Sequence, residues 1–363
     1  MLTVGVEEEF LLVDQEGQLC PVGPAVVDEV DPDDTEGEIQ RELARAQVES
    51  ATGICTTAEE IVEQLREMRE RLAQEAASSG ARLIPSGTPI LSENQPPEIT
   101  PNLRYRRMAK HFGAIASTGS TCGNHVHVAV PDRETAVRVS NHLRPWLPVL
   151  LALTANSPFF DGVDTAYASW RHVLWSRWPS AGPPPLFDSL DHYESSVEAL
   201  LRSEAMLDRA MVYWDVRLSE AHPTLEFRVC DVAATPEEAA LVALFSRGLV
   251  TRALHDIDDG VPAPRLPQEV LRGNLWRAAR DGFGGSVLHP VNGQLVPVRG
   301  IVAELLEHVR PVLEASGDVE FAERTLAGLD RNGGGAQRQQ AAYARRGDLA
   351  DVLALLTAES GSA

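Results

Sequence analysis

The chain has 363 residues, of which 44% are hydrophobic and 23% charged, a composition typical of a globular protein large enough to bury a sizeable core. Its 53 acidic residues outnumber the 32 Lys and Arg residues and give a net charge of −21, which argues against general binding to nucleic acid or an anionic membrane. An acidic excess of this kind is typical of a solvated surface, so it does not by itself predict a metal site.

The first predicted element is a strand at Thr3–Val13. Successive side chains of a strand point to opposite faces, so Glu7 and Glu9 share one face of this segment. Glu8 points the other way, together with Phe10 and the apolar residues around it. We therefore expect Glu7 and Glu9 to act together and Glu8 not to be a ligand.

A helix and a second strand follow. The capping-box pattern at Thr57–Glu60 precedes apolar residues at helical spacing over Ile61–Ala76, which predicts a helix with one buried face. Alternation over Gly123–Val130 then predicts a strand in which His125 and His127 share a face opposite three valines.

The next segment, from about Arg133 to Asn156, is apolar at helical spacing, but Pro145 and Pro148 must kink or break any helix there. Beyond it, a short strand carries Asp215 and Arg217 on one face and bulky apolar residues on the other. This strand repeats the pattern of the first two.

The last strand, Thr224–Asp231, places Glu226 and Arg228 on one face against three apolar residues on the other. A second capping box at Thr235–Glu238, with proline at the first helical position, predicts a helix that continues through Leu254. Four strands thus pair polar residues on one face with apolar groups on the other. A sheet has this pattern when helices cover one side and the other side lines a polar cleft.

The polar faces offer carboxylate oxygens, imidazole nitrogens and a guanidinium. Carboxylates suit Mg²⁺ or Mn²⁺, which commonly bridge protein groups to nucleotide phosphates, and an arginine two residues from a ligand could hold a phosphoryl group. Each motif also has another reading. Glu7 and Glu9 could form a solvated face, the histidine pair also suits zinc, and Glu226 with Arg228 could be a cross-strand ion pair. Neither a P-loop nor a Rossmann fingerprint is present.

The sequence also predicts where the protein works and how it is organised. The N-terminus has no secretory leader pattern, and the best candidate for an apolar span, Val149–Leu153, is far too short to cross a bilayer. The four cysteines are scattered without C-x-x-C spacing, so we expect neither a zinc framework nor a set of disulfides. We expect a cytoplasmic protein built as one catalytic domain over residues 1–363.

Several motifs occur in an order that resembles one family. The ordered segments are Gly5-Val6-Glu7-Glu8-Glu9-Phe10, Gln47-Val48-Glu49, Cys122-Gly123-Asn124-His125-Val126-His127-Val128, Ser157-Pro158-Phe159, Tyr213-Trp214-Asp215-Val216-Arg217 and Leu225-Glu226-Phe227-Arg228-Val229-Cys230-Asp231. The set resembles the bacterial carboxylate–amine ligases, also called type 2 glutamate–cysteine ligases, and the resemblance extends from residue 3 to about residue 355.

The resemblance implies an α+β, glutamine-synthetase-like fold in which a curved antiparallel sheet forms a half-barrel with helices packed on its outer face. It implies ATP and Mg²⁺ (or Mn²⁺) as cofactors. By position, the residues that match metal ligands of the family are Glu7, Glu9, Glu42, Glu49, His125 and Glu226. A solvated residue is an equal alternative for Glu42.

The resemblance also implies roles for other polar residues. Arg228 matches the residue that contacts the transferred phosphoryl group, and with Glu226 it forms the expected catalytic pair. Arg217 and Asp215 are expected to bind the nucleotide, and Arg171 and His127 the substrate, with structural ion pairing as the rival role.

The implied reaction joins a carboxylate to an amine through an acyl phosphate, with glutamate as the expected acyl donor. Two alternatives are a phosphotransferase of the guanidino-kinase type and a metal-dependent amide hydrolase. We expect small-molecule partners, no nucleic acid and no membrane, and leave a homo-oligomer open. The segment Leu218–Pro223 departs from the family pattern, which leaves the acceptor amine, cysteine included, undetermined.

Overall fold

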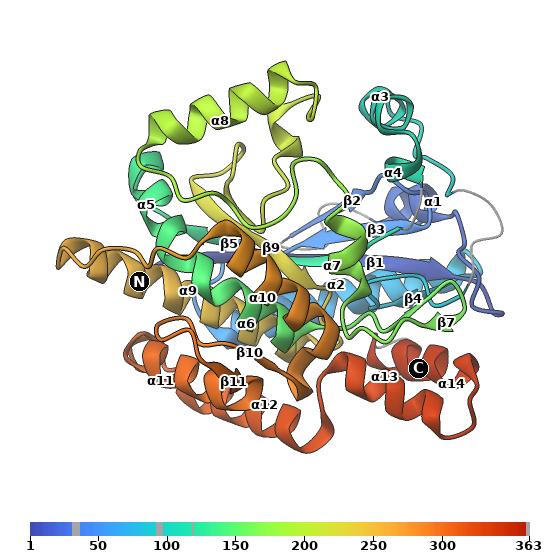
Figure 1. Ribbon diagram of the computed structural model, residues 1–363. Helices are drawn as coiled ribbons and strands as arrows, with labels where there is room; N and C mark the ends of the chain where they lie inside the picture. The colour runs from blue at the N-terminus through green and yellow to red at the C-terminus, as the bar shows by residue number, and fades with distance from the viewer. Residues whose placement is uncertain (31–36, 92–96, 118–119, 361–363) are drawn as a thin grey trace.

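The computed structural model describes residues 1–30, 37–91, 97–117 and 120–360. At its centre lies a seven-stranded antiparallel sheet (Figure 1). The strands are β1 (Val4–Val13), β2 (Glu38–Arg41), β3 (Gln47–Ala51), β4 (Arg82–Ile84), β5 (Gly123–Ala129), β8 (Val216–Leu218) and β9 (Thr224–Asp231). They are ordered β2-β3-β1-β5-β9-β8, and β4 pairs with the C-terminal end of β1.

Two long helices, α2 (Ala58–Ser78) and α9 (Pro236–Asp258), pack against the apolar face of this sheet. Both begin at the predicted caps: the Thr57 hydroxyl accepts from the Glu60 N–H, and the Thr235 hydroxyl accepts from the Glu238 N–H. The inward residues of β1, β5 and β9 join both helices in one hydrophobic core. The predicted helices and the predicted apolar face of the sheet are confirmed.

The two prolines break the helix predicted after β5 into three pieces. These are α5 (Arg133–Leu143), a 3₁₀ turn (Arg144–Trp146) and α6 (Leu147–Thr154). Proline lacks an N–H and clashes with the preceding turn, so each proline sits in the first turn of a new piece.

The remaining elements surround the sheet. The helices are α1 (Gly23–Glu29), α3 (Leu103–Phe112), α4 (Ala114–Ser117), α7 (Trp170–Trp175), α8 (Leu190–Arg202), α10 (Gln268–Asp281), α11 (Val298–Ser316), α12 (Val319–Asn332), α13 (Gly335–Ala344) and α14 (Leu349–Glu359). Two small hairpins pair β6 (Phe159–Phe160) with β7 (Val163–Asp164) and β10 (Ser286–Leu288) with β11 (Leu295–Pro297).

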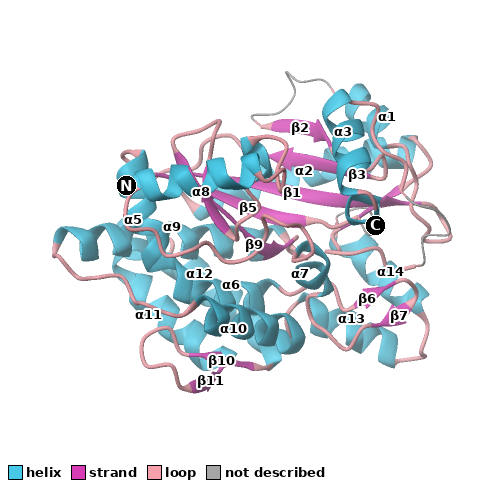
Figure 2. Ribbon diagram, turned by 45° about the horizontal axis from the view of Figure 1, so that its top comes forward, coloured by secondary structure: helices cyan, strands magenta, loops and turns pink. Residues whose placement is uncertain are grey.

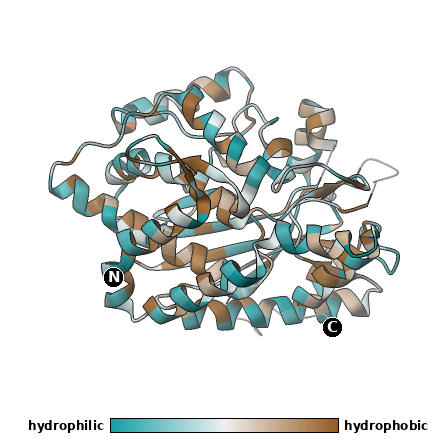
Figure 3. Ribbon diagram, turned by 60° about the horizontal axis from the view of Figure 1, so that its bottom comes forward, coloured by the Kyte–Doolittle hydropathy of each residue, from teal (hydrophilic) through white to brown (hydrophobic). Residues whose placement is uncertain are grey.

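The sheet separates two sets of helices. In Figure 1, α3 and α8 lie above it and α11 and α12 below it. Figure 2 shows both small hairpins set apart from the main sheet, and in Figure 3 most helices carry hydrophilic and hydrophobic residues on the same helix, as surface helices do. Of the helices described, none combines the length and apolar character needed to span a membrane. The predicted mixture of helices and antiparallel sheet is confirmed, whereas half-barrel curvature stays a prediction.

A buried ion pair joins β1 to α2 on the side of the sheet away from its polar face. Arg69 donates to Glu8 from Nε at 2.8 Å and from Nη2 at 2.5 Å. The same guanidinium donates to the carbonyl oxygens of Ala233 and Ala234 at 2.9 and 3.0 Å, and both charged side chains are at most 2% exposed. Glu8 therefore points away from Glu7 and Glu9, as alternation predicts, and it is held there by a cation that sequence reasoning did not assign to it.

Replacing Arg69 with methionine should destabilise the protein by about 3–5 kcal/mol, because it leaves the Glu8 carboxylate buried without a partner. Urea unfolding followed by circular dichroism measures this. The matched control is Arg66→Met on the same helix, whose side chain is 55% exposed and pairs with Glu237 at the surface, so its effect should be below about 1 kcal/mol. Equal effects of the two substitutions would contradict a buried-pair role for Arg69.

Candidate active site

The register of the sheet brings the predicted polar residues together. Glu9 of β1 lies directly opposite Glu49 of β3, and Glu7 lies opposite His125 of β5. On the other side of β5, His127 lies opposite Glu226 of β9, which in turn lies opposite Arg217 of β8. Directly opposed residues on one face have Cβ atoms about 4.5–5.5 Å apart, so strand pairing alone places these groups within reach of one another.

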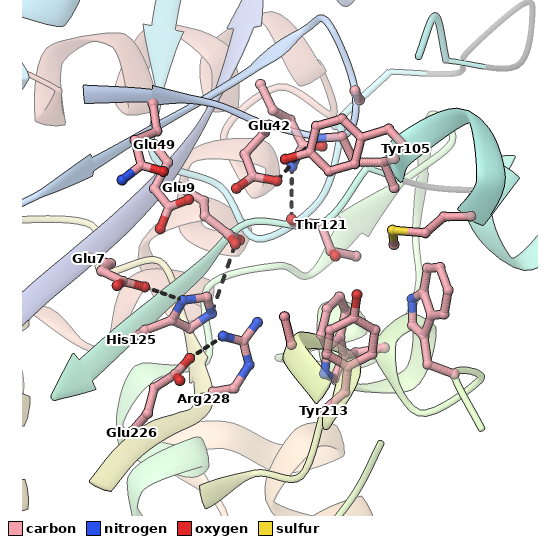
Figure 4. Close-up of a pocket in the computed structure, with 18 of the residues that line it drawn as sticks. Glu7, Glu9, Glu42, Glu49, Tyr105, Thr121, His125, Tyr213, Glu226 and Arg228 are labelled. Atoms are coloured by element: carbon pink, nitrogen blue, oxygen red, sulfur yellow. Dashed lines mark hydrogen bonds and ion pairs between the residues drawn. The ribbon is translucent and has the colours of Figure 1, made fainter. Parts of the chain in front are cut away.

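The two histidines connect the carboxylates of β1 to those of β9. His125 Nδ1 lies 3.1 Å from one oxygen of Glu7, and His127 Nε2 lies 3.0 Å from the other. His125 Nε2 is 3.8 Å from Glu9 (Figure 4). His127 Nδ1 is 2.9 Å from the hydroxyl of Thr224, which fixes the orientation of the ring.

Burial and the neighbouring charged groups shift the pKa values of Glu7, His125 and His127. Burial alone would raise the pKa of Glu7, but the hydrogen bonds from His125 and His127 outweigh it and hold that pKa well below its usual range. Burial, reinforced by the cation of Arg228, lowers the pKa of His125. For His127 the hydrogen bond and charge of Glu7 outweigh burial, so its pKa is raised.

Glu9, Glu42 and Glu49 form a second group of carboxylates. Glu42 follows β2 directly and lies beside Glu49 at the pocket (Figure 4). Burial, and then the adjacent carboxylate of Glu42, raise the pKa of Glu49 well above its usual value. Burial also raises the pKa of Glu9, whose carboxylate accepts the N–H of Gly123 at 2.6 Å. These groups are crowded like charges, a condition that a bound cation relieves.

Glu226 is held between two arginines. Arg217 donates to both of its oxygens, at 2.7 and 3.0 Å, and Arg228 donates to one of them. Although burial would raise the pKa of Glu226, the charges of Arg228 and Arg217 lower it strongly. The Arg228 guanidinium also lies over the rings of Trp175 and Tyr213, 5.7 and 5.8 Å from their centroids. Its direction is thus fixed by a carboxylate on one side and two aromatic rings on the other.

These residues line one cavity of about 430 Å³. The sequence-predicted residues on its wall are Glu7, Glu9, Glu42, Glu49, His125, His127, Arg217, Glu226 and Arg228. Arg171 and Asp215 are both 2% exposed and do not line this cavity. Their predicted substrate and nucleotide roles therefore remain predictions.

Arg171 and Asp215 lie behind the pocket wall. Arg171 donates to the carbonyl oxygen of Arg228 at 3.3 Å and passes so close to Gly123 that a Cβ there would overlap its Nη2 atom. Burial, partly offset by the Arg171 charge, raises the pKa of Asp215 to about 7. The carbonyl oxygen of Asp215 accepts the N–H of Arg228, and its own N–H donates to the carbonyl oxygen of Gly182. The strand β8 runs over Val216–Leu218, so it is shorter than the predicted strand Tyr213–Arg217 and begins three residues later.

The donor atoms fit a divalent cation in two places. One candidate set is Glu7, His127 and Glu226, and the other is Glu7, Glu49 and His125; within each set the donor atoms lie within 4.8 Å of one another. Carboxylate-rich sets with one imidazole suit Mg²⁺ or Mn²⁺. The structure thus places His127, predicted to bind substrate, among candidate metal donors as well.

Sequence reasoning missed the aromatic part of the cavity. Its wall includes Tyr105, Trp175, Trp178 and Tyr213, from α3, α7 and the segments that follow α7 and precede β8. The signal was present in the cluster of three tryptophans between residues 170 and 178. It is ambiguous in sequence, because tryptophans at such spacing pack into a core as often as they line a pocket.

Comparison with known proteins identifies the family. The model of glutamate–cysteine ligase family 2 matches residues 3–354. The chain belongs to this family. A relative from Rhodococcus jostii (strain RHA1), which carries the provisional name glutamate–cysteine ligase 2-1, is 53% identical over 99% of this chain and 96% of its own. A Saccharopolyspora erythraea protein with the same provisional name is 49% identical over 97% of this chain and 93% of its own.

Among solved structures, the chain resembles the glutamate–cysteine ligase of Francisella tularensis in complex with AMP. The TM-score is 0.70 over 99% of this chain and 88% of that one, and the sequence identity is 13%. At this identity the likeness shows a shared fold. Membership of the family makes the protein an ATP-dependent ligase that forms C–N bonds, which confirms the predicted enzyme class.

The crowded carboxylates predict an unusual response of stability to pH. The pKa of Glu49 is higher in the folded protein than in the unfolded chain, so its contribution to stability is lost as pH rises above the unfolded value of about 4.3. Without divalent cations at pH 8, Glu49→Gln should therefore melt about 2 °C or more above the unsubstituted protein, and the difference should vanish near pH 4.

Thermal melts at both pH values, with and without Mn²⁺, measure this effect. Mn²⁺ should raise the melting temperature of the unsubstituted protein more than that of Glu49→Gln. The control is Glu67→Gln on the exposed face of α2, which should leave both quantities unchanged. Two results together would contradict this explanation: a lower melting temperature of Glu49→Gln than of the unsubstituted protein at pH 8, and an equal rise of both melting temperatures with Mn²⁺. They would show that the carboxylates of the pocket do not repel one another in a way that Mn²⁺ relieves.

Proposed function

We propose that this protein uses ATP and Mg²⁺ to join the γ-carboxylate of glutamate to an amine through an acyl phosphate. The observation that carries the proposal is the position of Arg228. Its guanidinium is buried, is oriented by Glu226 and two aromatic rings, and lies in a cavity whose opposite wall is built of carboxylates. A fixed cation facing metal-binding carboxylates is the arrangement that phosphoryl transfer requires.

The carboxylates and histidines would hold the divalent cations, in the sets Glu7–His127–Glu226 and Glu7–Glu49–His125. When bound, the cations neutralise phosphate charge and orient the nucleotide. The protein itself keeps two of the donors ionised. The depressed pKa values of Glu7 and Glu226 keep both as carboxylates across the physiological range.

The reaction has two steps. A carboxylate oxygen of the donor attacks the γ-phosphorus of ATP, so that a P–O bond forms to the donor and the bond to ADP breaks. The amine nitrogen then attacks the acyl carbon, phosphate leaves with the C–O bonding electrons, and the nitrogen loses a proton to give the amide. Arg228 would contact the phosphoryl oxygens in both steps.

Half-barrel curvature of the sheet would suit this chemistry, because it would turn the polar faces of β1, β5 and β9 toward a shared centre. Glutamate is proposed as the donor because the family and the named relatives are glutamate–cysteine ligases. Membership of a ligase family also favours amide formation over the two alternatives, phosphotransfer to a guanidino group and metal-dependent amide hydrolysis.

An assay with ATP, Mg²⁺, glutamate and a pool of amines should yield ADP, phosphate and a new amide in equal amounts, because one ATP is consumed for each bond formed. Liquid chromatography with mass spectrometry identifies the amide. Omitting glutamate or the amines is the control. A stable phosphorylated product without amide would instead support a phosphotransferase, and hydrolysis of amides without ATP would support a hydrolase.

Glu226→Gln should lower kcat by about 100-fold or more, because it removes a candidate metal ligand and the charge that orients Arg228. Steady-state kinetics with a thermal melt of each variant separates loss of chemistry from loss of folding. The matched control is Glu307→Gln, an exposed carboxylate paired with Arg310 on α11, which should keep full activity. Retained turnover in Glu226→Gln would refute the proposed assignment of this residue.

A further inference from the structure

Three aromatic side chains form a continuous surface in the cavity, which we call the aromatic wall: Trp175, Trp178 and Tyr213. Their ring centroids are 4.7 Å apart for Trp175 and Tyr213, 5.4 Å for Trp178 and Tyr213, and 6.2 Å for the two tryptophans. Trp178 and Tyr213 are 8% and 7% exposed. Rings that contact one another and still line a cavity offer a rigid apolar surface to a ligand.

The aromatic wall begins where the chemistry is proposed to take place. The Arg228 guanidinium lies over two of its rings, Trp175 and Tyr213. A group bound against the wall is therefore a near neighbour of the phosphoryl group that Arg228 would contact.

The position of the aromatic wall next to Arg228 indicates which of the three reactants, ATP, the acyl donor or the amine, can contact it. The base of ATP is separated from its γ-phosphoryl by the ribose and two further phosphates, so it cannot rest on rings that contact Arg228 while the γ-phosphoryl is there. The donor carries a carboxylate on its side chain as well as on its backbone, and aromatic carbon does not compensate the desolvation of a side-chain carboxylate. The amine is the reactant left to occupy the wall, because its nitrogen must reach the acyl carbon next to the phosphoryl group.

Further apolar residues line the same cavity. Leu174 comes from α7, Met108 from α3 and Ile115 from α4. Together with the three rings they give this side of the cavity an apolar lining. Filling an apolar surface is favourable in proportion to the area removed from water, so a larger side chain gains more there.

We infer that the acceptor is an amine with a large apolar side group, branched aliphatic or aromatic, which packs against the aromatic wall. Ser219, Glu220 and His222, from the loop between β8 and β9, line the same cavity and are within reach of a group bound there. The inference rests on the proposed function and specifies its acceptor.

The first test compares acceptors with the unsubstituted protein, ATP, Mg²⁺ and glutamate, and needs no variant. The probes are alanine, cysteine, leucine and phenylalanine. Leucine or phenylalanine should have a kcat/KM at least about tenfold above that of alanine, since one to several methylenes in an apolar pocket discriminate by about that factor or more. Cysteine or alanine as the best acceptor overturns the inference and leaves the proposed ligase reaction standing, whereas no amide with any amine overturns both.

The second test changes the aromatic wall without touching Arg228. Trp178→Leu should raise KM for leucine or phenylalanine about tenfold and leave KM for ATP within about twofold, and Trp178→Phe, which keeps a ring, should fall between it and the unsubstituted protein. The control, Trp276→Leu, changes a tryptophan that is 46% exposed on α10 and outside the cavity, and should change neither. A rise in KM for ATP instead of the amine would assign the wall to the nucleotide and overturn the inference.

Discussion

The fold places several carboxylates close together on one face of an antiparallel sheet, and the rest of the site depends on how their mutual repulsion is offset. Cross-strand pairing forces Glu9 and Glu49 to face each other, although directly opposed like charges destabilise a sheet. Glu42 adds a third carboxylate beside them. The sheet compensates by placing histidines next to Glu7 and arginines next to Glu226. Glu7 and Glu226 are thus offset by neighbouring side chains of the protein, whereas Glu42 and Glu49 remain crowded carboxylates and candidates for a bound cation.

The buried pair of Glu8 and Arg69 matters because it sets the register that this arrangement needs. A shift of β1 by one residue would exchange the two faces, burying Glu7 and Glu9 among apolar groups and exposing Glu8. Arg69 is bound to Glu8 and to the carbonyl oxygens that follow β9, so it ties β1, α2 and the start of α9 together. The ion pair of Glu8 and Arg69 on the covered face therefore helps to hold Glu7 and Glu9 in position on the open face.

Much of this could be read from the sequence, and what could not has a physical reason. Period-two alternation assigned each of three pairs to one face of its own strand, because side-chain direction in a strand is a local property. The pairs are Glu7 and Glu9, His125 and His127, and Glu226 and Arg228. The capping boxes and the proline break were local too. Arg69 lies at a buried helical position, but its partner is 61 residues away, so the pair needed the tertiary structure. The burial of Arg171 and Asp215 behind the wall depended equally on packing between distant segments.

The contrast between local sequence pattern and packing of distant segments also applies to the two halves of the cavity. The half proposed to bind phosphoryl groups is built from neighbouring strands, so strand register fixes its geometry and a short motif in each strand indicates it. The half proposed to bind the amine is built from α3, α4, α7 and the segments that follow α7, precede β8 and precede β9, whose positions are set by packing. Helices and loops at the rim can change their side chains without disturbing the ladder of the sheet. The strand motifs therefore indicate the reaction class, whereas the residues proposed to contact the acceptor come together only through tertiary packing, which no local sequence pattern predicts.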